Sequence, residues 1–164
     1  MNNYRYLSVQ TALMQSVVKL PSFPLCLLAF VAITGFNGVS PSHQVVGIWE
    51  SEEKNLQIEM FEDNGQFAGR MIYFKCSSEE IMRTSTDREN PDKNLIGRKL
   101  LGLKLVTKLE YKGMNVWDEG EIYDPNSGRI FDARIKLTSP NTAIVRGYWK
   151  YRWLGRSMVF NRKM

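Results

Sequence analysis

The chain has 164 residues, 43% of them hydrophobic, which suffices for one domain with a hydrophobic core, and no internal repeat indicates a second domain. Only two basic residues, Arg5 and Lys19, precede Glu50, the first acidic residue, and the remaining 20 basic residues face 17 acidic ones, a formal charge of about +3. Because these basic residues are interleaved with acidic ones and form no contiguous positive run, the composition argues against nucleic-acid binding.

A hydrophobic leader is the first predicted element. An apolar run at 25–33 follows Lys19, and small and helix-breaking residues occupy positions 35–42. This order is typical of a secretory signal peptide, and the apolar run is shorter than the roughly 20 residues that a transmembrane helix needs. An anchored or interfacial helix is the alternative. We therefore expect residues 1–42 to be a signal peptide with its flanking segment, and residues 43–164 to be the mature domain.

The start and the cleavage point of the leader follow from the same pattern. The stretch before Lys19 is long for the amino-terminal region of a signal peptide, so the chain starts at Met1 or at Met14. We expect cleavage between about Gly35 and Gln44. The mature protein is then periplasmic or secreted, and it meets a membrane only through the leader before cleavage.

Cysteine and histidine usage limits the chemistry of the mature domain. Cys26 lies in the leader, so Cys76 is the one cysteine expected after cleavage and no internal disulfide is predicted. The single histidine, His43, lies beside the expected cleavage site, and we expect the folded part to lack histidine. Histidine-dependent catalysis and nearly all zinc, copper and non-haem iron sites are then excluded. The sequence predicts no enzyme activity, no catalytic residue, no metal and no cofactor.

From position 45 onward, short alternating apolar runs are separated by turn residues, and no stretch has a helical period. This pattern predicts eight strands, at 45–51, 55–62, 66–75, 101–111, 116–123, 129–137, 142–149 and 156–162. Turns such as Asn64-Gly65 join neighbouring strands as hairpins. Because closure removes the two open edges of such a meander, we expect an all-β, eight-stranded antiparallel up-and-down barrel.

Alternation along the strands predicts which side chains face the interior. In the fourth strand the expected inner residues are Leu101, Leu103, Leu105 and Leu109, and in the sixth they are Phe131, Ala133, Ile135 and Leu137. Arg146 in the seventh strand is consistent with either face. The one long connection, 76–100, carries balanced charge, and its length in a small domain predicts a functional lid or a mobile segment.

Several short motifs occur in a fixed order between 45 and 162. They are Val46-Gly47-Ile48-Trp49, Asn64-Gly65-Gln66-Phe67-Ala68-Gly69, Asn90-Pro91-Asp92, Gly97-Arg98 with Leu101-Gly102-Leu103, Gly120-Glu121-Ile122-Tyr123-Asp124-Pro125 with Gly128, Val145-Arg146-Gly147-Tyr148, and Leu154-Gly155-Arg156. Together they resemble the bacterial exported family catalogued as domain of unknown function 2147. The resemblance implies a leader, a periplasmic or secreted location and a lipocalin-like barrel. The chain departs from the family pattern at Phe160, where a tryptophan is usual, and at Glu119-Gly120, where two glycines are usual.

Gly47-Ile48-Trp49 also resembles the first-strand motif of lipocalins, in which the tryptophan forms the floor of the barrel beneath an arginine from the last strand. Arg162 stands in the matching position. The resemblance implies a structural cation-π contact that closes one end of the barrel. The alternative is a surface tryptophan and a solvated arginine.

A cluster of aromatic and cationic residues near strand ends is the candidate ligand site. Its members are Trp117, Tyr123, Arg146, Tyr148 and Arg156. Guanidinium groups recognise carboxylate or phosphate, and aromatic faces hold an apolar body, so the cluster points to an anionic or amphipathic small molecule. Core packing plus surface charge is the alternative.

The predicted function is an exported, lipocalin-like binding protein for such a molecule, and the sequence does not identify a protein partner. The alternative is an envelope structural or interaction protein whose barrel is filled and holds no ligand, and a hydrolase or isomerase without histidine is a third. A cavity of about 300 Å³ or more would favour the binding protein. An interior filled by Leu103, Leu105, Phe131 and Ile135 would favour the interaction protein.

Overall fold

The computed structural model describes residues 39–163. Residues 1–38 of the predicted leader segment, with Lys19, Cys26 and the apolar run 25–33, lie outside these residues. Within 39–163, no helix is both long enough and apolar enough to cross a membrane.

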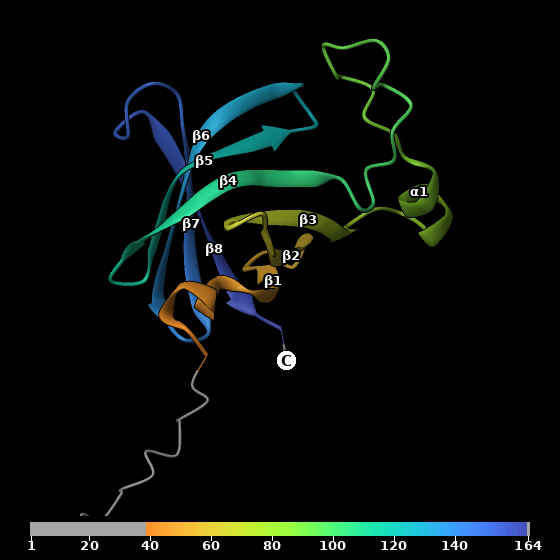
Figure 1. Cartoon of the computed structure of the whole chain (residues 1–164). Coiled ribbons are helices and arrows are strands. Elements are labelled where there is room, and N and C mark those ends of the chain that lie inside the picture. The colour runs from red at the N-terminus through yellow and green to blue at the C-terminus, as the bar shows by residue number, and fades with distance from the viewer. Residues whose placement is uncertain (1–38, 164) are drawn as a thin grey trace, which may run out of the picture. The chain divides into compact units, whose positions relative to one another are not determined.

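Eight antiparallel strands form a closed barrel (Figure 1). They are β1 (Gly47–Ser51), β2 (Leu56–Asp63), β3 (Gln66–Phe74), β4 (Lys104–Gly113), β5 (Val116–Asp124), β6 (Arg129–Ser139), β7 (Thr142–Tyr148) and β8 (Gly155–Arg162). Each strand pairs with the next along the chain, and β8 pairs with β1 to close the ring. The predicted all-β, up-and-down barrel is confirmed. Two short helices accompany it: the 3₁₀ helix η1 (Pro41–Val45) and α1 (Glu79–Thr84).

The fourth strand departs from the predicted alternation. It begins at Lys104, and Leu101 is exposed in the turn before it. Gly69 of β3 pairs with Val106 and Arg70 pairs with Lys104, so Leu105 is an extra residue on β4. This irregularity leaves Leu105 and Val106, neighbours in sequence, both buried. A strict period of two cannot describe a strand that contains a bulge.

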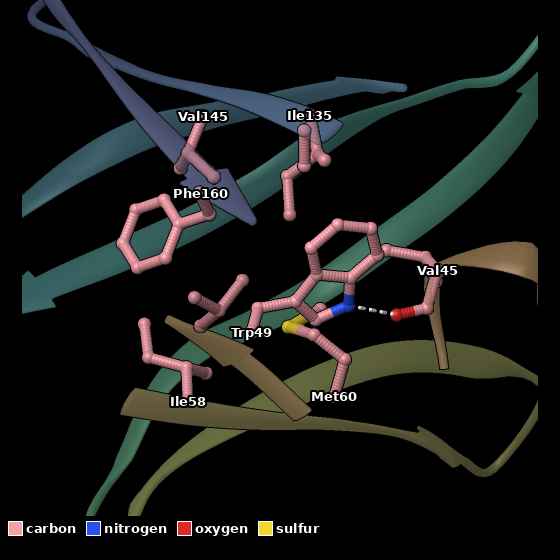
Figure 2. A pocket seen from close by; sticks show the side chains of 9 residues that line it. Val45, Trp49, Ile58, Met60, Ile135, Val145 and Phe160 are labelled. Atoms are coloured by element: carbon pink, nitrogen blue, oxygen red, sulfur yellow. Dashed lines mark hydrogen bonds between the residues drawn. The ribbon is translucent and has the colours of Figure 1, made fainter. Parts of the chain in front are cut away.

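Residues 41–46, here called the end cap, lie across one end of the barrel (Figure 1). The indole Nε1 of Trp49 donates to the carbonyl oxygen of Val45 at 2.7 Å (Figure 2), and that of Trp117 donates to the carbonyl oxygen of Ser42 at 3.0 Å. A buried indole N–H needs such an acceptor. The end cap therefore supplies backbone carbonyls that two core tryptophans require.

The prediction that the folded part lacks histidine is wrong. His43 lies in η1, its Nε2 is 2.7 Å from Oε2 of Glu62, and its ring packs edge-on against Phe67 at 5.5 Å between centroids. The sequence places His43 beside the expected cleavage site because small and helix-breaking residues follow the apolar run up to position 42. Its role depends on contacts with residues far along the chain.

Arg162 joins the last strand, the first strand and the end cap. Its guanidinium lies 4.3 Å from the centre of the Trp49 ring, and Trp49 is its direct partner in the β1–β8 register. The guanidinium also donates to the carbonyl oxygens of Val46, at 2.8 Å, and of Gln44. A Cβ at Gly47 would lie 2.7 Å from Nη1 of Arg162, so glycine leaves room for the arginine there. The contact expected from the first-strand motif is thus present, at the capped end.

We expect Arg162→Ala to lower the free energy of unfolding by about 1 kcal/mol or more, since the cation-π contact and the packing of the arginine stem are both lost. Urea denaturation followed by tryptophan fluorescence measures the change. Lys163→Ala is the control, because Lys163 makes only an exposed pair with Glu50 at 3.4 Å, and such pairs contribute little. Equal denaturation midpoints for Arg162→Ala and the parent would contradict a closing role.

Candidate functional site

The barrel is open at the end opposite the end cap. The β3–β4 connection (green) and the β7–β8 connection (blue) both lie at this end, away from the orange end cap (Figure 1). The interior is less filled here. Met158 of β8 is the register partner of Val145 and lines the interior beside it, yet it is 45% exposed.

An apolar cavity of about 480 Å³ occupies this half of the barrel. Its wall is drawn from β2, β3, β4, β5, β7 and β8, and includes Ile58, Met71, Leu105, Ile122, Val145 and Phe160. The volume falls in the range of small-molecule sites. It exceeds the volume of about 300 Å³ above which a binding protein is favoured over a filled barrel.

A second hollow, of about 660 Å³, adjoins the first at the rim and shares Ile122, Asp124, Val145 and Met158 with it. The β7–β8 connection contributes Trp149, Trp153 and Leu154 to its wall. Together the two hollows lead from the rim of the barrel into its interior.

Beneath the cavity the interior is nearly closed. A space of about 20 Å³ remains there, lined by apolar side chains that include Trp49, Met60, Ile135 and Phe160 (Figure 2). The Trp49 ring lies in this lining between Ile135 and Met60, next to Val45 (Figure 2). The open cavity therefore has an apolar floor.

Arg156 is the predicted ligand-binding cation that lies at the mouth. It is the register partner of Gly147 and lines the rim hollow, on the same face of β8 as Met158 and Phe160. Because Gly147 carries no side chain, the space opposite the arginine stem stays open. Asp124 lines the same hollow, but its carboxylate accepts hydrogen bonds from the amide of Asn126 and the hydroxyl of Ser127.

Trp117 does not belong to this site. It is fully buried and packs against Phe67 and Tyr111, and its Nε1 bonds to the end cap. The assignment of Trp117 to the ligand cluster is corrected: this tryptophan is a core residue near the capped end. Its place along β5 sets it far from the rim, which residue type alone does not reveal.

Arg146 and Tyr148 lie on the outer face of β7. Val145 and Gly147 line the interior, the β7–β8 register is unbroken, and side chains alternate across a strand, so their neighbours point outward. Arg146 donates to the carbonyl oxygen of Arg152 at 2.7 Å and to Oγ of Ser157 at 2.9 Å. Tyr148 is buried and borders the rim hollow. The structure therefore separates Arg146 from Arg156, which the predicted cluster had placed together.

Tyr123 reaches the rim and anchors the β3–β4 connection. Its hydroxyl donates to Oδ1 of Asp87 at 2.7 Å, and Oδ2 of Asp87 accepts from Nε of Arg98 at 2.8 Å and from the amide of Asn90 at 2.7 Å. The Arg98 guanidinium lies 5.0 Å from the centre of the Tyr123 ring. The long connection is thus tied to β5 through a buried carboxylate.

The electrostatics of this anchor keep Asp87 ionised. Burial alone would raise the pKa of Asp87, but the hydrogen bonds from Tyr123, Asn90 and Arg98, together with the Arg98 charge, lower that pKa below its ordinary value. Burial and the neighbouring Asp87 charge raise the pKa of Tyr123. The tyrosine therefore stays a neutral donor while the carboxylate stays charged.

The anchor is further supported at the β5–β6 turn. Gly128 has a φ of +66°, and a Cβ there would lie 1.9 Å from the carbonyl oxygen of Glu89. Glycine lets the β3–β4 connection pack directly on this turn. The sequence alone did not identify the residues of this anchor, Asp87, Asn90 and Arg98. The Asn90-Pro91-Asp92 and Gly97-Arg98 motifs were the signal in the sequence that this connection has a fixed structure.

Cys76 is half-buried, and its thiol donates to the carbonyl oxygen of Ser78. In the part of the chain that the structure describes, no three His, Cys, Asp or Glu side chains are grouped as a metal site.

The family model described as "Uncharacterized protein conserved in bacteria (DUF2147)" matches residues 47–162. Among solved structures, the chain is similar to protein HP1028 from the human pathogen Helicobacter pylori, described as belonging to the lipocalin family, with 21% sequence identity and a TM-score of 0.66. The match covers 77% of this chain and 85% of that chain, and at this identity it shows a shared fold. No curated protein matches the chain.

We expect Asp87→Asn to destabilise the protein at pH 7 by roughly 1–3 kcal/mol, because a buried, charge-assisted hydrogen-bond network loses its acceptor charge. The folded-state pKa of Asp87 is lowered, so its ionisation stabilises the fold above the ordinary aspartate pKa of 3.8, and this contribution is lost as the pH falls through the folded-state value. The gap in urea midpoint between parent and variant should therefore shrink in acid.

Asp92→Asn is the matched control for this prediction, since Asp92 is an exposed aspartate in the same connection. It should leave the urea midpoint nearly unchanged at both pH values. A gap between parent and Asp87→Asn that is the same at neutral and acid pH would show that the charge of Asp87 does not hold the connection.

Proposed function

We propose that this chain, which belongs to the uncharacterised bacterial family DUF2147, is an exported lipocalin-like protein that binds a small amphipathic anion in the open half of its barrel. The observation that carries the proposal is the apolar cavity of about 480 Å³ beneath an open rim. An interior filled with side chains would have supported the envelope interaction protein instead. The cavity supports a role in holding a molecule.

The expected chemistry of the ligand follows from the lining of the site. The inner wall is apolar from Ile58 and Phe160 up to Met158, which suits a hydrocarbon body. Arg156 lies at the rim, and among residues 39–163 no acidic side chain lies within ion-pair distance of it. A carboxylate or phosphate at one end of the ligand would meet this guanidinium. Tyr123 also lines this cavity.

Export is part of the proposal. The order of basic residue, apolar run and small residues before position 43 supports a secretory leader, and the absence of a second mature cysteine makes the fold independent of disulfide formation. The compact barrel begins at the end cap, so the cleaved chain would need to retain residues 41–46. A periplasmic or extracellular location suits a carrier of a poorly soluble molecule.

We expect the purified protein to bind dodecanoate saturably, with Arg156→Ala lowering affinity about tenfold, which corresponds to about 1.4 kcal/mol. Isothermal titration calorimetry measures the affinity. Arg146→Ala is the matched control, because it removes the same side chain from the outer face of the neighbouring strand. Uncharged dodecanol should bind the parent and Arg156→Ala equally, because it has no charge for the guanidinium to meet.

Met158→Trp should abolish binding of both molecules by filling the cavity from its partly exposed inner wall. An affinity that falls equally in Arg146→Ala and Arg156→Ala would refute the assignment of Arg156. Absence of saturable binding to dodecanoate, dodecyl phosphate and dodecanol alike would refute the proposed function.

We expect the mature protein to begin at or before Pro41, because cleavage within 42–44 would remove the Ser42 carbonyl that Trp117 requires and the contact of His43 with Glu62. The contacts of the end cap therefore exclude the last part of the cleavage range, Gly35 to Gln44, that the sequence predicts. Amino-terminal sequencing of the protein from the cell envelope and the medium gives the answer. A mature terminus after Ser42, or an intact leader on soluble cytoplasmic protein, would contradict the prediction.

A further inference from the structure

The β7–β8 connection, residues 149–154, is an exposed aromatic loop. Its residues are Trp149, Lys150, Tyr151, Arg152, Trp153 and Leu154, and the four apolar ones are each more than half exposed, Trp153 reaching 75%. Single exposed apolar residues are common on soluble proteins, but a contiguous group of them marks an interaction site. We refer to residues 149–154 as the rim loop.

The rim loop has a defined structure. Tyr151 and Trp153 stack on each other at 6.0 Å between centroids, and Trp149 packs edge-on against Phe131 at 5.9 Å. The backbone bends through hydrogen bonds from the Leu154 amide to the Tyr151 carbonyl and from the Trp149 amide to the Leu154 carbonyl. The aromatic group is therefore presented by an organised turn.

Arg152 fastens the rim loop to the outer wall of the barrel. Its guanidinium donates to Oδ2 of the buried Asp118 at 2.7 Å, and its carbonyl oxygen accepts from Arg146. A hydrogen bond with Tyr148 and the Asp118 charge raise the pKa of Arg152. This cation is used internally, so it holds the loop in place and leaves Lys150 and Arg156 as the cations beside the aromatic group.

The rim loop belongs to a basic stretch of the sequence, and the acidic residues near it include Asp124, which lines the same hollow, and Asp132, the register partner of Tyr148. Asp132 is the last acidic residue of the chain, and eight basic residues follow it: Arg134, Lys136, Arg146, Lys150, Arg152, Arg156, Arg162 and Lys163. The expectation that basic and acidic residues interleave along the whole mature chain is thus wrong for this part. The modest net charge conceals a basic carboxyl-terminal quarter, which contains β7, β8 and the rim loop.

In place of the expectation that the protein meets a membrane only through its leader, we propose that the rim loop docks the open end of the barrel onto an anionic lipid membrane surface. Tryptophan and tyrosine are amphipathic and concentrate at the headgroup level of bilayers, and neighbouring cations add attraction to anionic lipids. The partner that fits this loop is a bilayer, which has an apolar interior beneath negatively charged headgroups. The basic stretch of sequence after Asp132, which includes Lys150 and Arg156, supplies charge complementary to anionic lipid.

The position of the rim loop favours a bilayer over a folded partner or a nucleic acid. Trp149, Trp153 and Leu154 also line the rim hollow, so a surface that receives the loop lies directly across the mouth of the cavity. Tyr151 and Trp153 stack on each other, which leaves each with one face already occupied and disfavours base stacking. The exposed edges of a stacked aromatic pair can still enter the headgroup region of a bilayer. The docking inference goes beyond the proposed ligand binding and stands without it.

The test uses the mature protein recovered from cells and vesicles of phosphatidylcholine with or without phosphatidylglycerol. We expect co-sedimentation with the anionic vesicles, a blue shift of tryptophan emission, and weaker binding as salt is raised. The double variant Tyr151→Ser/Trp153→Ser should lose about tenfold or more in vesicle affinity, because it removes the two most exposed rings. Lys150→Glu should weaken binding to anionic vesicles alone.

Met114→Ser is the matched control, since Met114 is 90% exposed in the β4–β5 turn at the capped end, and it should bind vesicles as the parent does. Met158→Trp, which fills the cavity, should also dock normally, so failure of ligand binding and failure of docking remain distinguishable. Equal vesicle binding by the parent and by Tyr151→Ser/Trp153→Ser, or no vesicle binding by the parent, would overturn the proposal. Salt-sensitive binding to a single-stranded oligonucleotide in place of vesicles would overturn it in favour of nucleic acid.

Discussion

The contact between Arg162 and Trp49 is the interaction on which the rest of the barrel depends. It lies where the last strand meets the first, and the same guanidinium bonds to carbonyls of the end cap. Because the end cap also accepts the indole N–H groups of Trp49 and Trp117, one end of the barrel is sealed by a single connected set of contacts. Large side chains are concentrated there, and the unfilled volume lies at the other end.

Two buried carboxylates anchor the connections of the open end to the barrel wall. Asp87 holds the β3–β4 connection through Tyr123 and Arg98, and Asp118 holds the rim loop through Arg152. In each case an arginine from a connection between strands forms an ion pair with an aspartate buried at the barrel wall. Such charge-assisted contacts are stronger than neutral hydrogen bonds. Because these contacts fix the two connections to the barrel wall, the rim of the cavity has a defined shape even though it is built from loops.

The sequence predicted what depends on local periodicity and missed what depends on long-range packing. The eight strands, and the contact of Trp49 with Arg162, followed from alternation and from a first-strand motif. His43, Trp117 and Asp87 were misassigned or missed because their roles are set by partners far along the chain. Arg146 and Arg156 show what the sequence alone does not reveal within one hairpin. Both are arginines of neighbouring strands, and only the strand register shows that Arg156 lies on the inner face of the barrel and Arg146 on the outer face.

The short seam between β1 and β8 has a consequence for how the chain acquires its structure. These strands share three paired positions, Trp49 with Arg162, Glu50 with Asn161 and Ser51 with Phe160, and they are the most distant neighbours in sequence. Joining them closes the longest loop in the fold, which carries the largest entropic cost. A chain that emerges amino terminus first holds β1 without its closing partner until β8 is free. The ring therefore closes only after the other seven strands have formed or emerged.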